Sequence, residues 1–158
     1  MDDAPGNERH DEEWEPFFQT VESHIEEVGY HLTYVGDEPP FCYSVGLSRT
    51  WSHPELLLYG LNYEDSGTIL AGLAEEVRRG RRFHHGYLDV EAFDRPVAFL
   101  EIPPDEYFGR FVVTLEFYSG AFDALQVVTP DAAGRFPWSG DCEAATVESQ
   151  PLLGRPPN

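Results

Sequence analysis

Lysine is absent from the sequence. All ten basic residues are arginine, against 29 aspartates and glutamates, and the formal net charge is −19. Such a charge repels nucleic acid phosphates and anionic lipid, so we expect neither nucleic acid nor a membrane as a partner. A well-solvated acidic surface is the simplest interpretation. Two alternatives stay open: a basic partner, or an acidic interaction protein that mimics nucleic acid.

Cysteines and long hydrophobic runs are also scarce. Two cysteines, Cys42 and Cys142, are too few for a disulfide framework, and Cys42 stands in an apolar run, which predicts a buried free thiol. No apolar stretch approaches the roughly 20 residues of a membrane span. The acidic N-terminus has no hydrophobic signal segment. We therefore expect a cytoplasmic protein.

The length of 158 residues fits one domain with a sizeable core. Acidic residues crowd the front of the chain, where residues 1–40 hold twelve of them and a single arginine. We expect a flexible acidic segment over residues 1–13, one domain over 14–153 and a loose tail over 154–158.

Two stretches have the periodicity of amphipathic helices. In residues 15–29, apolar side chains recur at helical spacing, Pro16 suits a first turn, and Gly29 suits the end. Residues 62–80 repeat the pattern and close at Gly80. The sequence therefore predicts two main helices.

Seven short apolar or alternating runs predict a sheet of about six strands, connected mostly to their neighbours in sequence. This arrangement favours an α+β fold with a largely antiparallel sheet, which could curl into a barrel. The predicted strands cover residues 30–35, 41–47, 56–61, 87–93, 97–102, 111–118 and 124–129.

The most strongly patterned stretch is residues 39–61, which predicts two buried neighbouring strands joined by the polar connector 48–55. His53 and Glu55 lie two residues apart, so on an extended segment they would point the same way, as a base and its orienting carboxylate would. The alternative is that His53 bonds the loop backbone and Glu55 caps the loop or pairs with Arg49. Ser44 lacks the glycine pattern of a nucleophile elbow.

A second loop, residues 130–138, follows the last predicted strand. Asp131 after a proline fits turn chemistry, and Arg135 is placed to pair with it. Phe136 and Trp138 are expected to pack together. Gln126 is a polar residue inside an apolar strand, so it faces either solvent or a buried pocket.

Four arginines, Arg78, Arg79, Arg81 and Arg82, form the one basic cluster. They could bind an anion, or they could complement the helix dipole and pair with the acidic N-terminal segment. Histidine and cysteine spacings match no metal motif, so no metal site is predicted. The sequence identifies no cofactor, and whether the protein uses one stays open.

The chain resembles an uncharacterised bacterial family, domain of unknown function 4262. The resemblance is carried by the motifs PPFCYSVGL (39–47), HPELLLYGL (53–61), LAEEVRRG (73–80), LQVVTPDAAGRFPW (125–138) and QPLL (150–153). This family brings no activity with it. A looser likeness, at the level of architecture, is to split-barrel flavin reductases, in which the loop between two such strands holds the flavin.

We expect a binding or accessory module for a small molecule or a protein, with one site over the loops 48–55 and 130–138. A flavin- or other cofactor-dependent enzyme on a split-barrel-like core is the alternative. The candidate ligand-binding residues are Tyr43, Trp51, His53, Glu55, Gln126, Asp131, Arg135 and Trp138.

Overall fold

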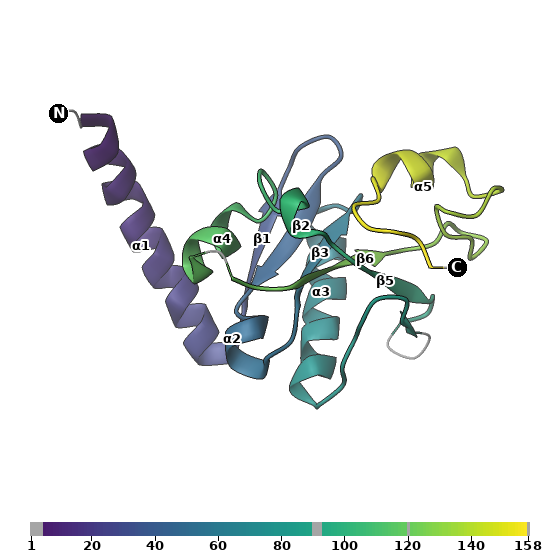
Figure 1. The fold of residues 1–158 in the computed structure, drawn as a ribbon, viewed down its shortest axis with the longest axis horizontal. Helices are drawn as coiled ribbons and strands as arrows, with labels where there is room; N and C mark the ends of the chain where they lie inside the picture. The colour runs from purple at the N-terminus through teal and green to yellow at the C-terminus, as the bar shows by residue number, and fades with distance from the viewer. Residues whose placement is uncertain (1–4, 90–92, 120, 158) are drawn as a thin grey trace.

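A single mixed sheet organises the computed structural model, which describes residues 5–89, 93–119 and 121–157, with side chains from residue 15. The strand order is β1-β2-β3-β6-β5-β4, and the sheet is open (Figure 1). Among the strand pairs of the described residues, β3 and β6 run parallel and the others antiparallel. The α+β fold is confirmed. The suggestion that the sheet curls into a barrel is wrong, because the edge strands β1 and β4 do not pair with each other.

The six strands are β1 (His31–Val35), β2 (Phe41–Val45), β3 (Glu55–Tyr59), β4 (Leu88–Asp89), β5 (Val97–Glu101) and β6 (Ala124–Val128). The helices in the described residues are α1 (Pro5–Val28), α2 (Leu47–Trp51), α3 (Tyr63–Arg78), α4 (Val112–Tyr118) and α5 (Ala144–Ser149), with a 3-10 turn at Pro104–Glu106. Residues 39–61 form the predicted pair of buried neighbouring strands, since β2 and β3 pair antiparallel.

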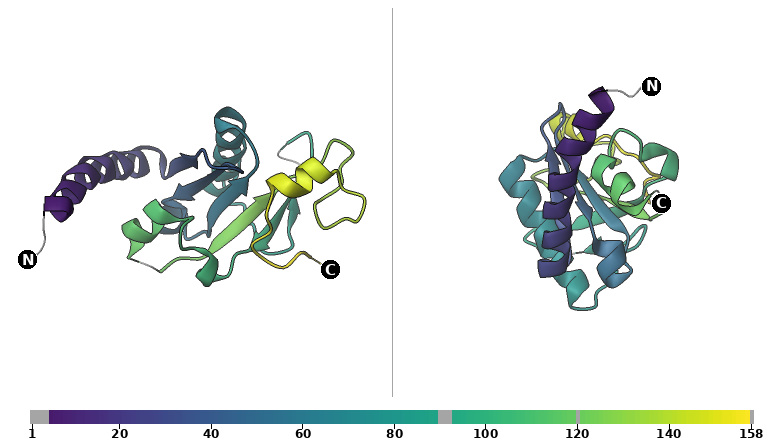
Figure 2. Two further views of the ribbon diagram at one scale, coloured as in Figure 1. Left: turned by 90° about the horizontal axis from the view of Figure 1, so that it is seen from above. Right: turned by 90° about the vertical axis from the view of Figure 1, so that its left-hand side faces the viewer.

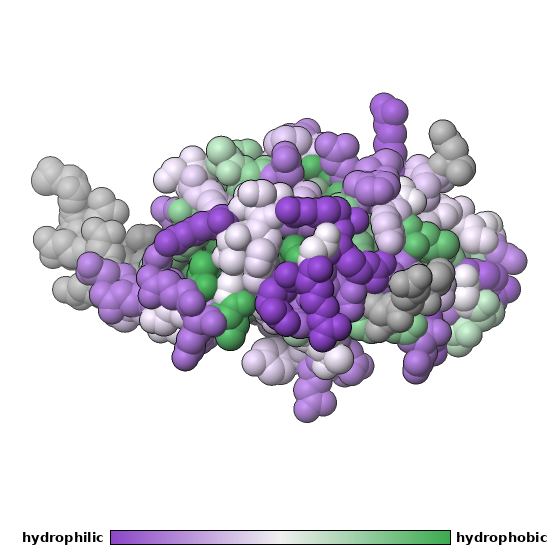
Figure 3. Space-filling model, turned by 90° about the horizontal axis from the view of Figure 1, so that it is seen from below, coloured by the Kyte–Doolittle hydropathy of each residue, from purple (hydrophilic) through white to green (hydrophobic). Residues whose placement is uncertain are grey.

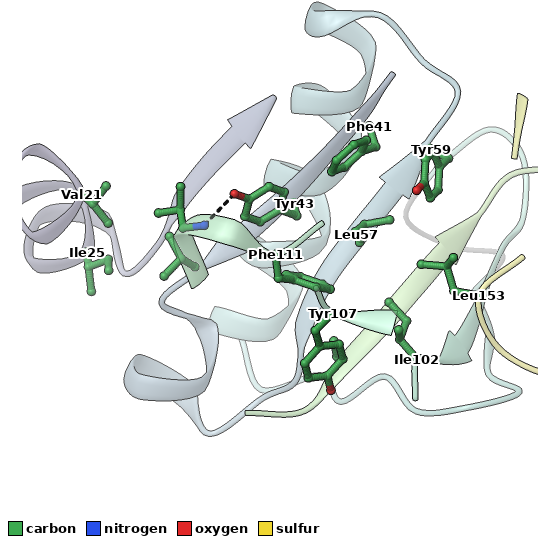
Figure 4. Packing of buried hydrophobic residues seen from close by; sticks show 13 residues of the cluster. Val21, Ile25, Phe41, Tyr43, Leu57, Tyr59, Ile102, Tyr107, Phe111 and Leu153 are labelled. Atoms are coloured by element: carbon green, nitrogen blue, oxygen red, sulfur yellow. Dashed lines mark hydrogen bonds between the residues drawn. The ribbon is translucent and has the colours of Figure 1, made fainter. Parts of the chain in front are cut away.

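The central strands are buried on both faces, and alternate residues therefore pack into two separate cores. On one face, Leu56 and Leu58 of β3 contact the layer that contains α3. On the other, Leu57 and Tyr59 join a cluster that contains residues of α1 and α4 (Figure 4). In Figure 2, α3 and α4 lie on opposite sides of the sheet, and the N-terminal part of α1 extends past its edge.

The predicted strand at residues 111–118 is wrong, because Val112–Tyr118 forms helix α4. Its β-branched residues favour a strand, but tertiary contacts decide otherwise. The backbone N–H of Val113 donates to the Tyr43 hydroxyl at 3.0 Å (Figure 4), and the Thr114 hydroxyl donates to the Ser44 carbonyl at 2.8 Å. Side-chain and backbone oxygens of β2 thus hold the first turn of α4.

The remaining elements refine the expected boundaries. Helix α1 begins at Pro5, ten residues before the predicted start, so Pro16 lies inside it and not in its first turn. The stretch upstream of Pro16 is rich in glutamate, which favours helix. Part of the polar connector forms α2, and α5 lies in a region without clear periodicity. The flexibility of residues 1–13 and 154–158 stays a prediction.

Candidate functional site

Glu55, at the start of β3, is fully buried beside the first turn of α2. Its carboxylate accepts five hydrogen bonds. The hydroxyls of Ser44 and Tyr118 donate at 2.6 Å each, and the backbone N–H groups of Gly46, Leu47 and Ser48 donate at 3.0 to 3.3 Å. These N–H groups have no partner within the helix, so Glu55 caps α2 from the strand that follows it.

This network is saturated. The Ser44 hydroxyl, which donates to Glu55, also accepts the N–H of Leu56 at 2.9 Å. The Tyr118 hydroxyl accepts the N–H groups of Gly46 and Arg49. Burial raises the pKa of Glu55, while the hydrogen bonds from Ser44 and Tyr118 oppose that rise. The arrangement ties β2, β3, α2 and α4 together.

His53 does not converge with Glu55. Its Nε2 atom accepts the N–H of Phe83 at 3.0 Å, so Nδ1 carries the proton and donates to the carbonyl of Pro54 at 2.9 Å. Burial lowers the pKa of His53, which favours this neutral form. Because both ring nitrogens form hydrogen bonds, His53 links the segment just before β3 to residue 83. Arg49 pairs with Glu22 of α1 and not with Glu55.

The aromatic residues of the predicted first loop also have packing roles. Tyr43 is buried in the core, where its ring centroid lies 5.3 Å from that of Phe111 and its hydroxyl accepts a hydrogen bond from the N–H of Val113. Trp51 ends α2 and covers Gly29, where an added Cβ would lie 2.3 Å from the indole. Neither side chain projects freely as a ligand contact.

The structure separates the two predicted loops. Glu55 pairs with Ala124 and Leu58 with Val127 in the parallel pair β3–β6. The connector 48–54 precedes β3, whereas the loop 130–138 follows β6, so the loops lie at opposite ends of the same two strands. The eight candidate residues therefore do not form one site.

The candidates near β6 order the C-terminal part of the chain. Buried Gln126 donates to the carbonyl of Pro151 at 2.8 Å and accepts the N–H of Leu153 at 2.9 Å. Asp131 accepts the N–H groups of Ala133, Arg135 and Glu143 and pairs with the Arg135 side chain, which confirms the predicted pairing. These backbone donors lower the pKa of Asp131 to about 2.

Trp138 stacks on Phe136 with ring centroids 5.0 Å apart, as predicted. The basic cluster is engaged within its own part of the molecule. Arg78 and Arg79 pair with Glu75, Arg81 pairs with Glu76 and Asp89, and Arg82 donates to the carbonyl of Ser52. The expected pairing with the acidic N-terminal segment is therefore not what holds these four side chains.

Two of the hollows in the described part of the chain lie at the two ends of the β3–β6 pair. The first, which we call the α1–α4 depression, has a volume of about 710 Å³ and is lined by Phe18, Glu22, Ser48, Arg49, Glu116, Phe117 and Tyr118. In the view from below, small apolar areas lie among hydrophilic side chains beside α1 (Figure 3). The depression borders the Glu55 network through Tyr118.

The second hollow, the carboxyl-end crevice, lies where β3 and β6 end. It has two adjoining arms of about 390 and 340 Å³, which share Leu61, Thr129 and Pro130. One arm is lined by α3 and the chain entering β5, through Asp65, Thr68, Ile69, Phe93, Asp94, Arg95, Pro96 and Val97. The other is lined by Tyr59, Gly60 and residues of or next to α5, namely Ala145, Thr146, Ser149 and Gln150.

Sequence comparison places the chain in a family. The family described as "Domain of unknown function (DUF4262)" matches residues 24–143, and the chain belongs to it. No match was found among curated proteins or among solved structures. Within the described residues, no helix is long and apolar enough to span a membrane, and no three His, Cys, Asp or Glu side chains are grouped as metal ligands would be.

Two key residues escaped the sequence analysis. Tyr118 was placed in a predicted strand, so its hydroxyl could not be related to Glu55. The glycine and serine after it are a helix-ending signal that could have indicated α4. Gln150 had no local pattern; its amide brackets Thr129, accepting from the N–H and donating to the carbonyl. Only the folded chain brings Tyr118 to Glu55 and Gln150 to Thr129.

Proposed function

We propose that this protein is a binding module for a small amphipathic organic molecule, which occupies the carboxyl-end crevice. One observation carries the proposal: the chain leaves the ends of β3 and β6 toward opposite faces of the sheet. After β3 it enters α3, whose Leu70 and Leu73 lie in one core, whereas after β6 it runs to Leu153 in the other core. Diverging connections at the carboxyl ends of parallel neighbours leave a crevice, which is the usual ligand site of open sheets.

The crevice walls are held in place by polar contacts. Gln150 fixes Thr129 at the base, and Gln126 fixes the returning C-terminal segment. On the opposite wall, the Asn62 side chain caps α3 by accepting the N–H of Asp65 at 2.8 Å. A wall that is already ordered loses little conformational entropy when a ligand binds.

The lining determines the class of ligand. Leu61, Ile69, Phe93 and Pro130 supply apolar surface, and hydroxyls of threonine and serine supply hydrogen bonds. Arg95 stands at the rim of the larger arm beside Asp94 and forms no ion pair among the described residues. This combination suits a compact molecule with an apolar body and a few oxygen atoms. The flavin alternative depended on a barrel core and loses that support in an open sheet.

The test combines native mass spectrometry of the purified protein with ligand-observed NMR, using a set of small aromatic alcohols and carboxylic acids. Thr68→Trp places a large side chain at the larger arm and should abolish binding of the compounds that bind the native protein. Val147→Trp is the matched control, because Val147 is exposed on α5 outside the crevice lining. Compounds that bind equally to both variants would place the site elsewhere.

A further inference from the structure

The α1–α4 depression already holds a cation of its own. The Arg49 side chain lies with its guanidinium carbon 5.6 Å from the centre of the Phe117 ring, and its Nη1 is 2.9 Å from a Glu22 carboxylate oxygen. An aromatic face together with a carboxylate is the arrangement by which proteins recognise ammonium and guanidinium groups. The position of the Arg49 side chain therefore shows that this surface accommodates a guanidinium group.

Most of the donors that an anion would need at this depression are occupied. The N–H groups of Gly46, Leu47 and Ser48 in the first turn of α2 point to the Glu55 carboxylate. The Tyr118 hydroxyl also donates to Glu55. Of the lining groups, the guanidinium of Arg49 and the hydroxyl of Ser48 are the donors left for an anion, and Arg49 is paired with Glu22.

The charges around the depression favour a positive ligand. Two carboxylates, Glu22 and Glu116, line it with one guanidinium, and the whole chain carries −19. A strongly negative protein concentrates cations at its surface and steers them toward acidic hollows. The Arg49 side chain is 48% exposed, so it can turn into solvent when another cation takes its place.

We propose that the α1–α4 depression binds a small organic cation, whose ammonium or guanidinium group replaces that of Arg49 between Phe117 and the carboxylates of Glu22 and Glu116. This second site is independent of the carboxyl-end crevice. The same charged group could be carried by a free metabolite or by an arginine side chain of a protein, and the two sources are separated by the choice of probe.

The experiment compares three probes of similar shape by NMR titration of the full chain: benzylguanidine, benzyl alcohol and benzoate. Benzylguanidine should bind and shift the amide signals of residues 116–118, and its affinity should fall as salt is raised. The neutral alcohol and benzoate should not bind there. A blocked Gly-Arg-Gly peptide forms a fourth arm. Binding as tight as that of benzylguanidine would indicate a protein source, and weaker binding a metabolite.

Substitution of Arg49 is expected to change the binding affinity in opposite directions for a cationic and for an anionic ligand. Arg49→Ala removes the resident competitor and should tighten benzylguanidine binding by roughly two- to fivefold, whereas Phe117→Leu and Glu22→Gln should each weaken it by a similar factor. Arg79→Ala is the control, because Arg79 is an exposed arginine paired with Glu75 on α3. Benzoate binding that disappears with Arg49→Ala would overturn the proposal, as would unchanged benzylguanidine affinity in all the variants.

Discussion

At the amino ends of β3 and β6, neighbouring segments are drawn together around the Glu55 carboxylate, whereas at the carboxyl ends the chain parts toward opposite faces. The first end uses its polar groups internally: Ser44, Tyr118 and the first turn of α2 all donate to Glu55. The second uses Gln126 and Gln150 to order the base and one wall of the crevice. Buried polar groups thus fill the space at one end of the strand pair, while at the other end polar contacts order the walls of a crevice.

The strongest test of this comparison is Glu55→Gln. Glutamine keeps the size of the side chain. Its NH₂ group, however, replaces a carboxylate oxygen that accepts hydrogen bonds from hydroxyl and N–H groups in the native protein. We expect the free energy of unfolding to fall by roughly 3 kcal/mol, because buried donors that face the NH₂ group lose their acceptor. Urea denaturation followed by circular dichroism measures the change.

Glu116→Gln is the control for this variant. Glu116 is an exposed carboxylate on α4, so its neutralisation should change stability by no more than about 0.5 kcal/mol. Equal effects of the two substitutions would mean that the Glu55 network does not close the amino end, and the contrast with the carboxyl end would then disappear.

A smaller effect is expected from Gln126→Leu at the carboxyl end. Leucine fits the apolar surroundings of β6 but removes the bonds to Pro151 and Leu153, leaving a carbonyl and an N–H unpaired. We expect a loss of about 1–3 kcal/mol, with faster amide hydrogen exchange at Leu153. Gln19→Leu on the exposed face of α1 is the control. If Leu153 stays as protected as in the native protein, Gln126 does not hold that wall.

The sequence predicted the elements whose pattern is local. The β2–β3 pair and helix α3 each carry an uninterrupted apolar period, and the structure confirms them. The buried thiol of Cys42 is confirmed as well, and burial raises its pKa to about 11. Asp131 and Arg135 lie four residues apart, close enough for turn chemistry to indicate their contact.

What the sequence could not supply depends on contacts between distant segments. Helix α4 is decided by Tyr43 and Ser44, about 70 residues earlier in the chain. The separation of the two predicted loops follows from the parallel register of β3 and β6, which no local pattern encodes. His53 and Glu55 follow the alternative interpretation, in which His53 bonds the loop backbone and Glu55 caps the connector. The local pattern did not indicate their partners far along the chain, Phe83 and Tyr118.

The finest test compares one carboxylate from each end during acid titration. Backbone donors hold the pKa of Asp131 at about 2, below the ordinary 3.8, so its stabilising contribution is present above pH 3.8 and is lost as the pH falls toward 2. Burial raises the pKa of Glu55 above the ordinary 4.5, so its contribution is greatest below pH 4.5 and declines as the pH rises through the raised pKa.

Carboxyl ¹³C NMR between pH 2 and pH 7 should therefore show Glu55 taking up its proton well before Asp131 as acid is added. Glu55→Gln and Asp131→Asn identify the two signals by their disappearance. If Glu55 instead titrates below its ordinary pKa, its five donors outweigh burial, and the amino end is held by an ionised carboxylate throughout. Both ends would then be stabilised by an ionised carboxylate that accepts hydrogen bonds. They would differ only in the path of the chain: at one end α2 and α4 pack around the carboxylate, and at the other the chain leaves toward opposite faces of the sheet.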